Sequence, residues 1–463
     1  MHSLSIFGTS SDAGKSTLSF ALTYLLHKRG IKVAPFKAQN VSNNSMVTDI
    51  DSGEIAVPQA FAAEAIGLKS TPLFNPVLLK SGGRGKAHLI INGKTQAVKG
   101  VKEYYSRIDA LKPVVKEAFS KLQEEYECIV AEGAGSPVEL NLMEQDLSNI
   151  FIAKEFGTKI ILVADIERGG VFASIYGVYN LLPKELQKNV IGVIVNKFRG
   201  DMRLFDEGVQ IIERDFGLKV LGVVPYRAFN LGFEDSASLQ NYTQDTSKAK
   251  IKVGVFNLPH MSNFTDFEPL VADKEVELVF IDSKTEAKKM DMLVIPGSKL
   301  VFEDMRWLQE RGVWEYLKQT KKPLLGICGG YEMLFERLVD PAGVESQTKE
   351  MEGLGRFKGE VSFQSQKIVQ KGCYNLFGIM TNGYEIHNAT VKKRAKQKKN
   401  VYGTFVHGLF ESDEMRRFFF SQIDSSYEGY DFHTYKHETI ERFASFVERH
   451  VDVGCIIEKI NSV

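Results

Sequence analysis

Two stretches of the sequence combine residue types and spacings that could do chemistry. The first, Gly8–Thr17, reads GTSSDAGKST and lies between an apolar, strand-like run and a helix-like run. In a strand, glycine loop and helix arranged this way, backbone N–H groups and the helix N-terminus face phosphates. Lys15 would reach the terminal phosphates, and the Ser16 hydroxyl would hold a Mg²⁺ ion. The stretch therefore predicts a nucleotide site.

The spacing of this loop departs from the usual one. Five residues separate Gly8 from Gly14, so Thr9 stands where a glycine is usual. The alternative is a plain helix N-terminus with a capping serine. The strand before the loop and the helix after it favour nucleotide binding, by Thr9, Asp12, Ala13, Gly14, Lys15, Ser16 and Thr17.

The second stretch, Lys322–Leu334, reads KPLLGICGGYEML and places Cys328 between a buried-type strand and a helix. A sharp turn of this kind exposes a nucleophile at the sheet edge, and the helix N-terminus stabilises a thiolate. The N–H of Gly329 is placed to help stabilise an oxyanion. The alternative, a buried structural cysteine, is the usual fate of this residue type. The glycine-flanked corner favours a nucleophile for acyl transfer.

A thiolate site of this kind needs a base. Among the nine histidines, His407 ends a β-type run and precedes a glycine, so it would lie at a strand end like Cys328. His387 alternates with Glu385 on a strand face, and the other histidines lie in helical or tail contexts. We therefore expect His407 to be the base.

Other polar residues follow strands of the first half. Glu132 ends a buried-type strand, where an acid beside a P-loop commonly holds Mg²⁺. Asn196 ends a later strand, where an amide could contact the adenine. The amide-rich segment Lys37–Ser45 is either a surface loop or a set of contacts to nucleotide or substrate. Its candidate contact residues are Gln39, Asn40 and Asn43.

The elements that must position these residues alternate between apolar strands and helices. Strands that are apolar throughout indicate parallel sheets covered on both faces. We expect an α/β protein with two doubly wound domains. The expected strands are 4–7, 31–36, 126–131, 159–164, 190–195, 220–225, 251–256, 276–281, 291–296 and 322–327, with helices over 18–27, 54–70, 102–124 and 412–463. The apolar pattern stops at a polar stretch, so the expected boundaries are a domain over 1–232, a linker over 233–250 and a domain over 251–463.

Composition excludes several classes of protein. The formal net charge is zero, so no overall field draws the chain to nucleic acid or to a membrane. The four cysteines are widely spaced, which fits a reducing compartment rather than a disulfide framework or a zinc site. We find no signal peptide and no apolar run long enough to span a membrane, so a cytoplasmic protein is expected. The basic run 392–399 is most simply a solvated hairpin loop.

Taken together, the sequence resembles the cobyric acid synthase family, glutamine-dependent amidases of corrinoid biosynthesis. The resemblance covers nearly the whole chain. It rests on Gly8–Thr17, Phe36–Ser45, Ala131–Leu142, Asp165–Gly177, Val195–Asp201, Ile295–Lys299, Gly326–Leu334, Gly383–His387 and Tyr402–Phe410.

The resemblance implies an N-terminal P-loop domain related to dethiobiotin synthetase and MinD-type ATPases. It implies a C-terminal class I glutamine amidotransferase domain with Cys328 as nucleophile and His407 as base. It also implies an oxyanion held by backbone N–H groups near Gly297 and Gly329. The implied cofactors are ATP and Mg²⁺. The implied substrates are L-glutamine and adenosylcobyrinic acid a,c-diamide, amidated at its b, d, e and g carboxylates to adenosylcobyric acid. Tyr384 and His387 are candidate contacts of the corrinoid.

The sequence departs from the family pattern in two places. Most class I amidotransferases carry a Glu two residues after the histidine, where this chain has Leu409; the corrinoid-amidating branch lacks that acid, which leaves open what orients His407. Leu300 and Val301 replace the usual Asn-Thr pair. Two rivals remain: the sister enzyme that amidates the a and c carboxylates, and a MinD/ParA-like ATP switch with an inert amidotransferase-like domain.

Overall fold

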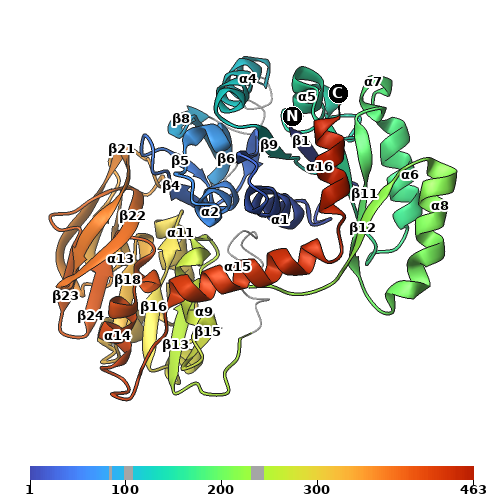
Figure 1. Cartoon of the computed structure of the whole chain (residues 1–463). Helices are drawn as coiled ribbons and strands as arrows, with labels where there is room; N and C mark the ends of the chain where they lie inside the picture. The colour runs from blue at the N-terminus through green and yellow to red at the C-terminus, as the bar shows by residue number, and fades with distance from the viewer. Residues whose placement is uncertain (83–85, 99–107, 231–243, 463) are drawn as a thin grey trace.

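A parallel sheet of six strands forms the centre of the N-terminal half of the chain (Figure 1). The computed structural model describes residues 1–82, 86–98, 108–230 and 244–462. The strand order is β12-β11-β10-β1-β9-β2, and every neighbouring pair is parallel, as expected from uniformly apolar strands. The strands are β1 (Leu4–Gly8), β2 (Val33–Phe36), β9 (Cys128–Glu132), β10 (Lys159–Asp165), β11 (Val190–Phe198) and β12 (Val220–Pro225).

Helices cover this sheet. They are α1 (Lys15–Lys28), α2 (Val57–Ala65), α4 (Ile108–Glu125), α5 (Ile150–Phe156), α6 (Val171–Leu181), α7 (Lys184–Gln187) and α8 (Asp206–Phe216). The helix expected over 54–70 is shorter, because Glu54–Ala56 forms a strand before it. The start of the helix expected over 102–124 and most of the expected linker lie outside the described residues.

Two small sheets that the sequence analysis did not anticipate also belong to the N-terminal half, which we call the phosphate-loop domain. One consists of β3 (Gln39–Val41), β6 (Val77–Gly82), β7 (Lys86–Ile91) and β8 (Lys94–Val98), and the other is a hairpin of β4 (Ser45–Val47) and β5 (Glu54–Ala56). Both begin in the amide-rich segment that follows β2. That segment is therefore built into structure rather than forming a plain surface loop.

A second six-stranded sheet organises the C-terminal half. Its order is β15-β13-β16-β18-β24-β23, parallel except for the edge strand β23. The strands are β13 (Ile251–Phe256), β15 (Val276–Ile281), β16 (Met292–Ile295), β18 (Leu324–Ile327), β23 (Ala395–Lys398) and β24 (Val401–Thr404). Since β23 lies within the basic run 392–399, the prediction of a plain loop there was wrong: its residues pair with β24.

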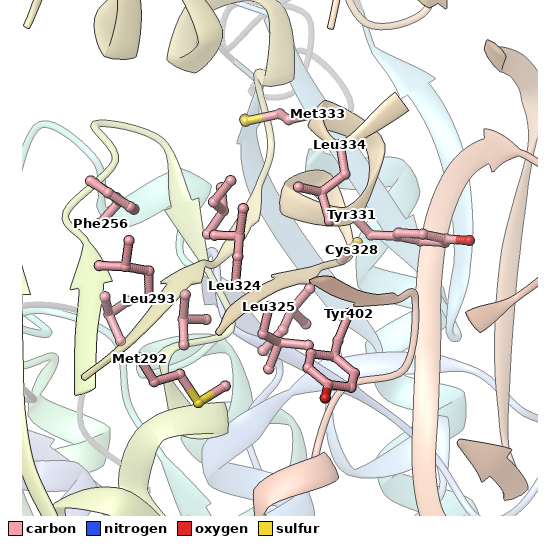
Figure 2. Packing of buried hydrophobic residues seen from close by; sticks show 14 of the residues in the cluster. Phe256, Met292, Leu293, Leu324, Leu325, Cys328, Tyr331, Met333, Leu334 and Tyr402 are labelled. Atoms are coloured by element: carbon pink, nitrogen blue, oxygen red, sulfur yellow. The ribbon is translucent and has the colours of Figure 1, made fainter. Parts of the chain in front are cut away.

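Short elements complete this domain. The helices are α9 (Glu268–Ala272), α10 (Lys284–Ala287), α11 (Val301–Glu310), α12 (Trp314–Gln319) and α13 (Gly329–Met333), and a two-stranded pair joins β14 (Met261–Ser262) to β17 (Gly297–Ser298). A mostly antiparallel sheet contains β19 (Phe335–Val339), β20 (Glu350–Glu352), β21 (Phe357–Leu376) and β22 (Ile379–Thr390). Figure 2 shows part of the apolar core around Cys328, with Leu324, Leu325, Leu334 and Tyr402 among its members.

The chain ends by returning to its first domain (Figure 1). The region 412–463 is helical as expected, and α14 (Asp413–Phe420) packs in the second domain. The next two helices, α15 (Phe432–Glu448) and α16 (Val453–Asn461), instead bury their apolar faces in the core of the first domain. The expectation that the whole region closes the second domain therefore fails. Amphipathic periodicity predicts a helix but not which core its apolar face joins.

Two candidate active sites

Cys328 occupies a strained corner between β18 and α13. Its backbone has φ 50° and ψ −110°, a conformation that a side chain rarely adopts. Close packing of the glycines makes the corner possible: a Cβ at Gly330 would lie 2.0 Å from the Ile295 carbonyl oxygen. The Cys328 sulfur lies 3.7 Å from the Ile386 carbonyl oxygen on β22. The expected elbow for a nucleophile is therefore present.

The two glycines expected to form an oxyanion site lie beside this corner. A Cβ built at Gly329 would approach the Ser298 backbone nitrogen to 2.8 Å, and one built at Gly297 would lie 3.2 Å from Cε1 of His407. Both glycines are buried. No side chain fits at either position unless a neighbour shifts. The backbone of both glycines can therefore lie close to Cys328 and to the His407 imidazole.

His407 reaches the same edge of the sheet from the neighbouring strand. β18 and β24 are parallel partners, with Ile327 opposite Thr404, so the residues that follow them lie side by side. Cys328 is among the groups that raise the pKa of His407, as expected if thiol and imidazole face each other. The sequence prediction that these two residues share one edge agrees with this arrangement.

Asp266 orients His407. Its Oδ2 lies 2.7 Å from Nδ1 of His407, and its Oδ1 accepts a hydrogen bond of 2.7 Å from the Gly408 N–H. Burial alone would lower the pKa of His407, but the Asp266 carboxylate outweighs burial and raises the pKa to about 10. With its Nδ1 proton directed to Asp266, the imidazole leaves Nε2 for the thiol. This is a Cys–His–Asp arrangement.

Sequence reasoning missed Asp266. It lies 141 residues before His407, in the 3-10 turn Phe264–Phe267, and belongs to no motif that the sequence analysis recognised. Leu409, two residues after His407, is fully buried among apolar residues and offers no carboxylate. One signal could have led to Asp266: its turn follows β13, a parallel strand of the same sheet, so it must lie near the edge that carries Cys328.

Tyr384 and His387, the two candidate corrinoid contacts, are both buried. Tyr384 stacks on His407 with ring centroids 5.3 Å apart, and its hydroxyl accepts a hydrogen bond from Asn263. His387 stacks on Phe405, and burial lowers its pKa to about 4. Their side chains thus pack within the glutaminase region, and corrinoid contact by either remains a prediction.

The phosphate loop forms as expected at the end of β1. Gly14 has φ 95° at the start of α1, a left-handed conformation that favours glycine. The buried Lys15 ammonium donates to the Ser10 carbonyl at 3.1 Å, and desolvation lowers its pKa to about 8. Thr9 is buried, whereas Asp12 is exposed and pairs with Arg168 at 3.2 Å. The loop therefore folds back on its own lysine.

Glu132 gathers the polar side chains next to the loop. Its Oε1 accepts from the Ser16 hydroxyl at 2.6 Å and from the Lys37 ammonium at 2.7 Å, and its Oε2 accepts from Gln59 at 3.3 Å. Two adjacent oxygen donors, the hydroxyl and the carboxylate, are what Mg²⁺ prefers, so these residues fit the predicted metal. Lys37 and Gln59 were not among the predicted residues, although Lys37 begins the amide-rich segment.

The remaining predicted residues lie around this site. Asn196 lies behind the loop, where its amide donates to the Ala13 carbonyl at 2.9 Å. Asn40 donates weakly to Gln59 at 3.5 Å, and the Gln39 N–H donates to Ser148. Thr17 follows Ser16 directly in the chain, and Asn43 lies in the same amide-rich segment as Gln39 and Asn40. Contacts of these residues with ligand remain predictions.

Comparison with known proteins matches both domains. Residues 4–230 match the family model of the CobQ/CobB/MinD/ParA nucleotide binding domain, and residues 252–415 match that of the CobB/CobQ-like glutamine amidotransferase domain. None of the helices in the described ranges is long and apolar enough to cross a membrane. The two matches correspond to the two sheets and to the two sites built on them.

Relatives match over the full length. The chain is 52% identical to the cobyric acid synthase of Acinetobacter baylyi, over 99% of each chain. It is 36% identical to the cobyric acid synthase of Thermodesulfovibrio yellowstonii over 98% of each chain, and 36% identical to that of Clostridium perfringens over 99% of each. With a phosphate-loop domain, a Cys–His–Asp site and full-length relatives of one name, the chain belongs to the cobyric acid synthase family of glutamine amidotransferase ligases.

Proposed function

We propose that the protein uses ATP and glutamine to amidate the b, d, e and g carboxylates of adenosylcobyrinic acid a,c-diamide, giving adenosylcobyric acid in cobalamin biosynthesis. The observation that carries this proposal is an oriented Cys328–His407 pair on the same chain as a phosphate loop. Full-length similarity to cobyric acid synthases supports the choice of substrate. We place the reaction in the cytoplasm.

The geometry around Cys328 supports the glutaminase half of the proposal. His407, held by Asp266 through Nδ1, takes the thiol proton on Nε2, and the thiolate attacks the side-chain amide of glutamine. Backbone N–H groups near Gly297 and Gly329 stabilise the oxyanion, and the imidazolium returns its proton to the departing ammonia. Water then hydrolyses the glutamyl thioester, which releases glutamate and restores the Cys328 thiol. A raised His407 pKa favours the thiolate–imidazolium pair that this step requires.

The synthetase half uses the residues around Glu132. The substrate carboxylate attacks the γ-phosphate of ATP to give an acyl phosphate, and ADP leaves. Lys15 and Lys37 supply positive charge for the phosphates. Mg²⁺, when bound by Ser16 and directly or through water by Glu132, neutralises charge on the phosphate oxygens. Ammonia displaces phosphate to give the amide. Asn196 contacts the adenine, and Gln39, Asn40 and Asn43 contact the corrinoid.

The test is mass spectrometry of adenosylcobyrinic acid a,c-diamide after incubation with the protein, MgATP and glutamine labelled with ¹⁵N in its amide. Four labelled amides are expected. A second incubation replaces the diamide by cobyrinic acid. Labelled amides at the a and c positions of cobyrinic acid, with none formed on the diamide, would point instead to the sister reaction. Hydrolysis of ATP without any labelled amide, together with nucleotide-dependent dimerisation, would support the ATP switch.

A further inference from the structure

The phosphate-loop domain contacts the glutaminase centre directly, through the segment that follows β2. This segment carries Lys37 at one end, beside Glu132, and Asn44 and Ser45 at the other. Asn44 accepts a hydrogen bond of 3.0 Å from the Asn263 N–H, and the Ser45 carbonyl accepts one of 3.2 Å from the Asn263 amide. One short segment thus joins the predicted phosphate site to Asn263.

Asn263 in turn supports both partners of the His407 imidazole. Its carbonyl accepts from the Asp266 N–H at 3.1 Å, which closes the turn that carries Asp266. Its amide donates to the Tyr384 hydroxyl at 2.9 Å, and the Tyr384 ring stacks on His407. Tyr384 and His407 also exchange backbone hydrogen bonds, at 3.3 and 2.8 Å. Any displacement of Asn263 therefore changes the surroundings of His407 from two sides.

Asn263 is buried, and its polar groups are hydrogen-bonded on both sides of the interface. Its exposure is 4%, as is that of Asn44. Both protons of its side-chain amide are used, one across the interface on Ser45 and one on Tyr384. Its backbone has φ 55° and ψ 52°, a left-handed conformation that asparagine tolerates better than most residues. Buried polar groups move together because separation leaves donors and acceptors unpaired.

The other end of the connection is held within the phosphate-loop domain. The Ser45 hydroxyl donates to Glu54 at 2.7 Å and accepts from Lys80 at 2.7 Å. Lys367, from the glutaminase domain, donates to the same Glu54 at 2.6 Å. These contacts hold the Ser45 side chain within the phosphate-loop domain, while the Ser45 carbonyl accepts from Asn263. The end of the segment that contacts the glutaminase turn is therefore held in place.

We propose that Asn263 is a positioning residue for glutamine hydrolysis that takes its own position from Asn44 and Ser45 of the phosphate-loop domain. Filling of the phosphate site at Lys37 and of the corrinoid site along the same segment then sets Asp266 and Tyr384 around His407 and raises glutaminase activity. This inference rests on the proposed function for the identity of the ligands. It gives the two half-reactions a physical reason to run together, so that ammonia is released when an acceptor is present.

The decisive variant is Asn44→Ala, which removes the acceptor of the Asn263 N–H and leaves every contact within the glutaminase domain in place. Glutamate release is measured with glutamine alone, with MgATP, and with MgATP plus the a,c-diamide. In the wild type we expect stimulation of fivefold or more, within the usual range of coupling between sites. In Asn44→Ala we expect most of this stimulation to disappear, while glutamine hydrolysis without ligands stays within about twofold of the wild type.

The matched control is Lys371→Ala, which removes another ion pair of the same interface, 2.7 Å from Asp49, far along the chain from Asn263. It should keep the stimulation. A second variant, Asn263→Asp, keeps the size of the side chain but loses both donated protons, and we expect a lower kcat for glutamine hydrolysis with amidation from ammonium chloride unchanged.

Three outcomes would overturn the proposal: a wild type that MgATP and diamide do not stimulate, an Asn44→Ala variant with full stimulation, or equal loss in Asn44→Ala and Lys371→Ala. Failure of the proposed function is seen separately, as no amidation of the diamide by the wild type with ammonium chloride. Stimulation by MgATP alone would still be readable in that case, since hydrolysis of glutamine is measured directly.

Discussion

Replacing Asp266 by asparagine should disable glutamine hydrolysis and spare the chemistry of the other domain. The substitution keeps the size of the side chain and exchanges a charged partner of His407 for a neutral one. Asp266 and His407 have side-chain exposures of only 2% each, so water cannot replace the lost charge. The N–H of Gly408 keeps a partner if the asparagine oxygen stays in place.

The magnitude follows from the pKa of the imidazole. The Asp266 carboxylate is the main group that raises this pKa from 6.5 to about 10 against the opposing effect of burial. At about 1.4 kcal/mol per pH unit, that difference corresponds to roughly 5 kcal/mol of preference for the imidazolium. Part of this preference persists through the hydrogen bond, so we expect kcat/KM for glutamine to fall by about 10²–10⁴. The upper value is the loss of about 10⁴ in kcat for the same substitution in a serine protease triad.

The pH dependence has a definite sign. The thiolate–imidazolium pair needs a proton on His407, and with Asp266 present that proton is lost only as the pH rises through about 10. In Asp266→Asn the His407 pKa should fall to its usual range or below, because burial then acts alone. The high-pH limb of kcat/KM for glutamine should therefore move down by two or more pH units, roughly in proportion to the lost charge interaction.

The assay is glutamate release at saturating MgATP and diamide over pH 6 to 10.5, beside amidation driven by ammonium chloride. Cys328→Ala is the matched control for loss of the glutaminase alone. An Asp266→Asn variant with kcat/KM for glutamine within twofold of the wild type and an unmoved high-pH limb would refute the assigned role. Equal loss with ammonium chloride would instead indicate a damaged fold.

Three further substitutions test the two sites and the ion pairs between the domains. Cys328→Ala should abolish amidation from glutamine and keep amidation from ammonium chloride; loss of both, measured by mass spectrometry, would contradict the two-site scheme. Lys37→Ala should lower amidation from either nitrogen source by tenfold or more and leave hydrolysis of glutamine alone unchanged, and unaltered amidation would exclude Lys37 from the phosphate site. Glu54→Gln leaves the ammonium groups of the buried Lys80 and the half-buried Lys367 without a carboxylate and should cost about 3–5 kcal/mol near neutral pH. Burial raises the pKa of Glu54, but these two ammonium groups more than reverse that effect, so its contribution is complete above pH 4.5 and fades only as the pH falls through its depressed value. Thermal unfolding at pH 7 and at pH 4 checks this. The wild type should melt at a higher temperature than Glu54→Gln at pH 7, by a slightly smaller margin at pH 4, and equal melting temperatures at pH 7 would disprove the role of Glu54.

The sequence was sufficient to predict the parts of the site that depend on parallel strands. Cys328 and His407 each follow an apolar strand, and parallel neighbours bring their carboxyl ends to one edge. The phosphate loop and Glu132 were predictable for the same reason, since β1 and β9 are parallel neighbours. In each case a local pattern, strand followed by a polar or glycine-rich corner, fixed where the side chain would lie.

Asp266 could not be predicted in this way, because its role depends on the packing of a loop. The turn Phe264–Phe267 has no periodicity, and it meets His407 only because two loops converge beyond the strand ends. Likewise, no pattern in the amide-rich segment distinguishes Asn44, which contacts the other domain, from Asn40, which stays within its own. Contacts between loops are set by tertiary packing that neighbouring residues do not encode.

The C-terminal helices give this interface its mechanical setting. Phe443 of α15 packs against Phe20 of α1 with ring centroids 6.1 Å apart, and Glu441 accepts from the Tyr24 hydroxyl at 2.6 Å. α15 begins after the glutaminase domain and ends on the phosphate-loop domain, so it ties the two together by an apolar face (Figure 1). Apolar packing is insensitive to small shifts of charge, whereas the buried hydrogen bonds of Asn263 depend on exact alignment. The apolar packing of α15 can therefore hold the two domains together, while the hydrogen bonds of Asn263 change when the alignment of the domains changes. Coupling between the two half-reactions requires both properties.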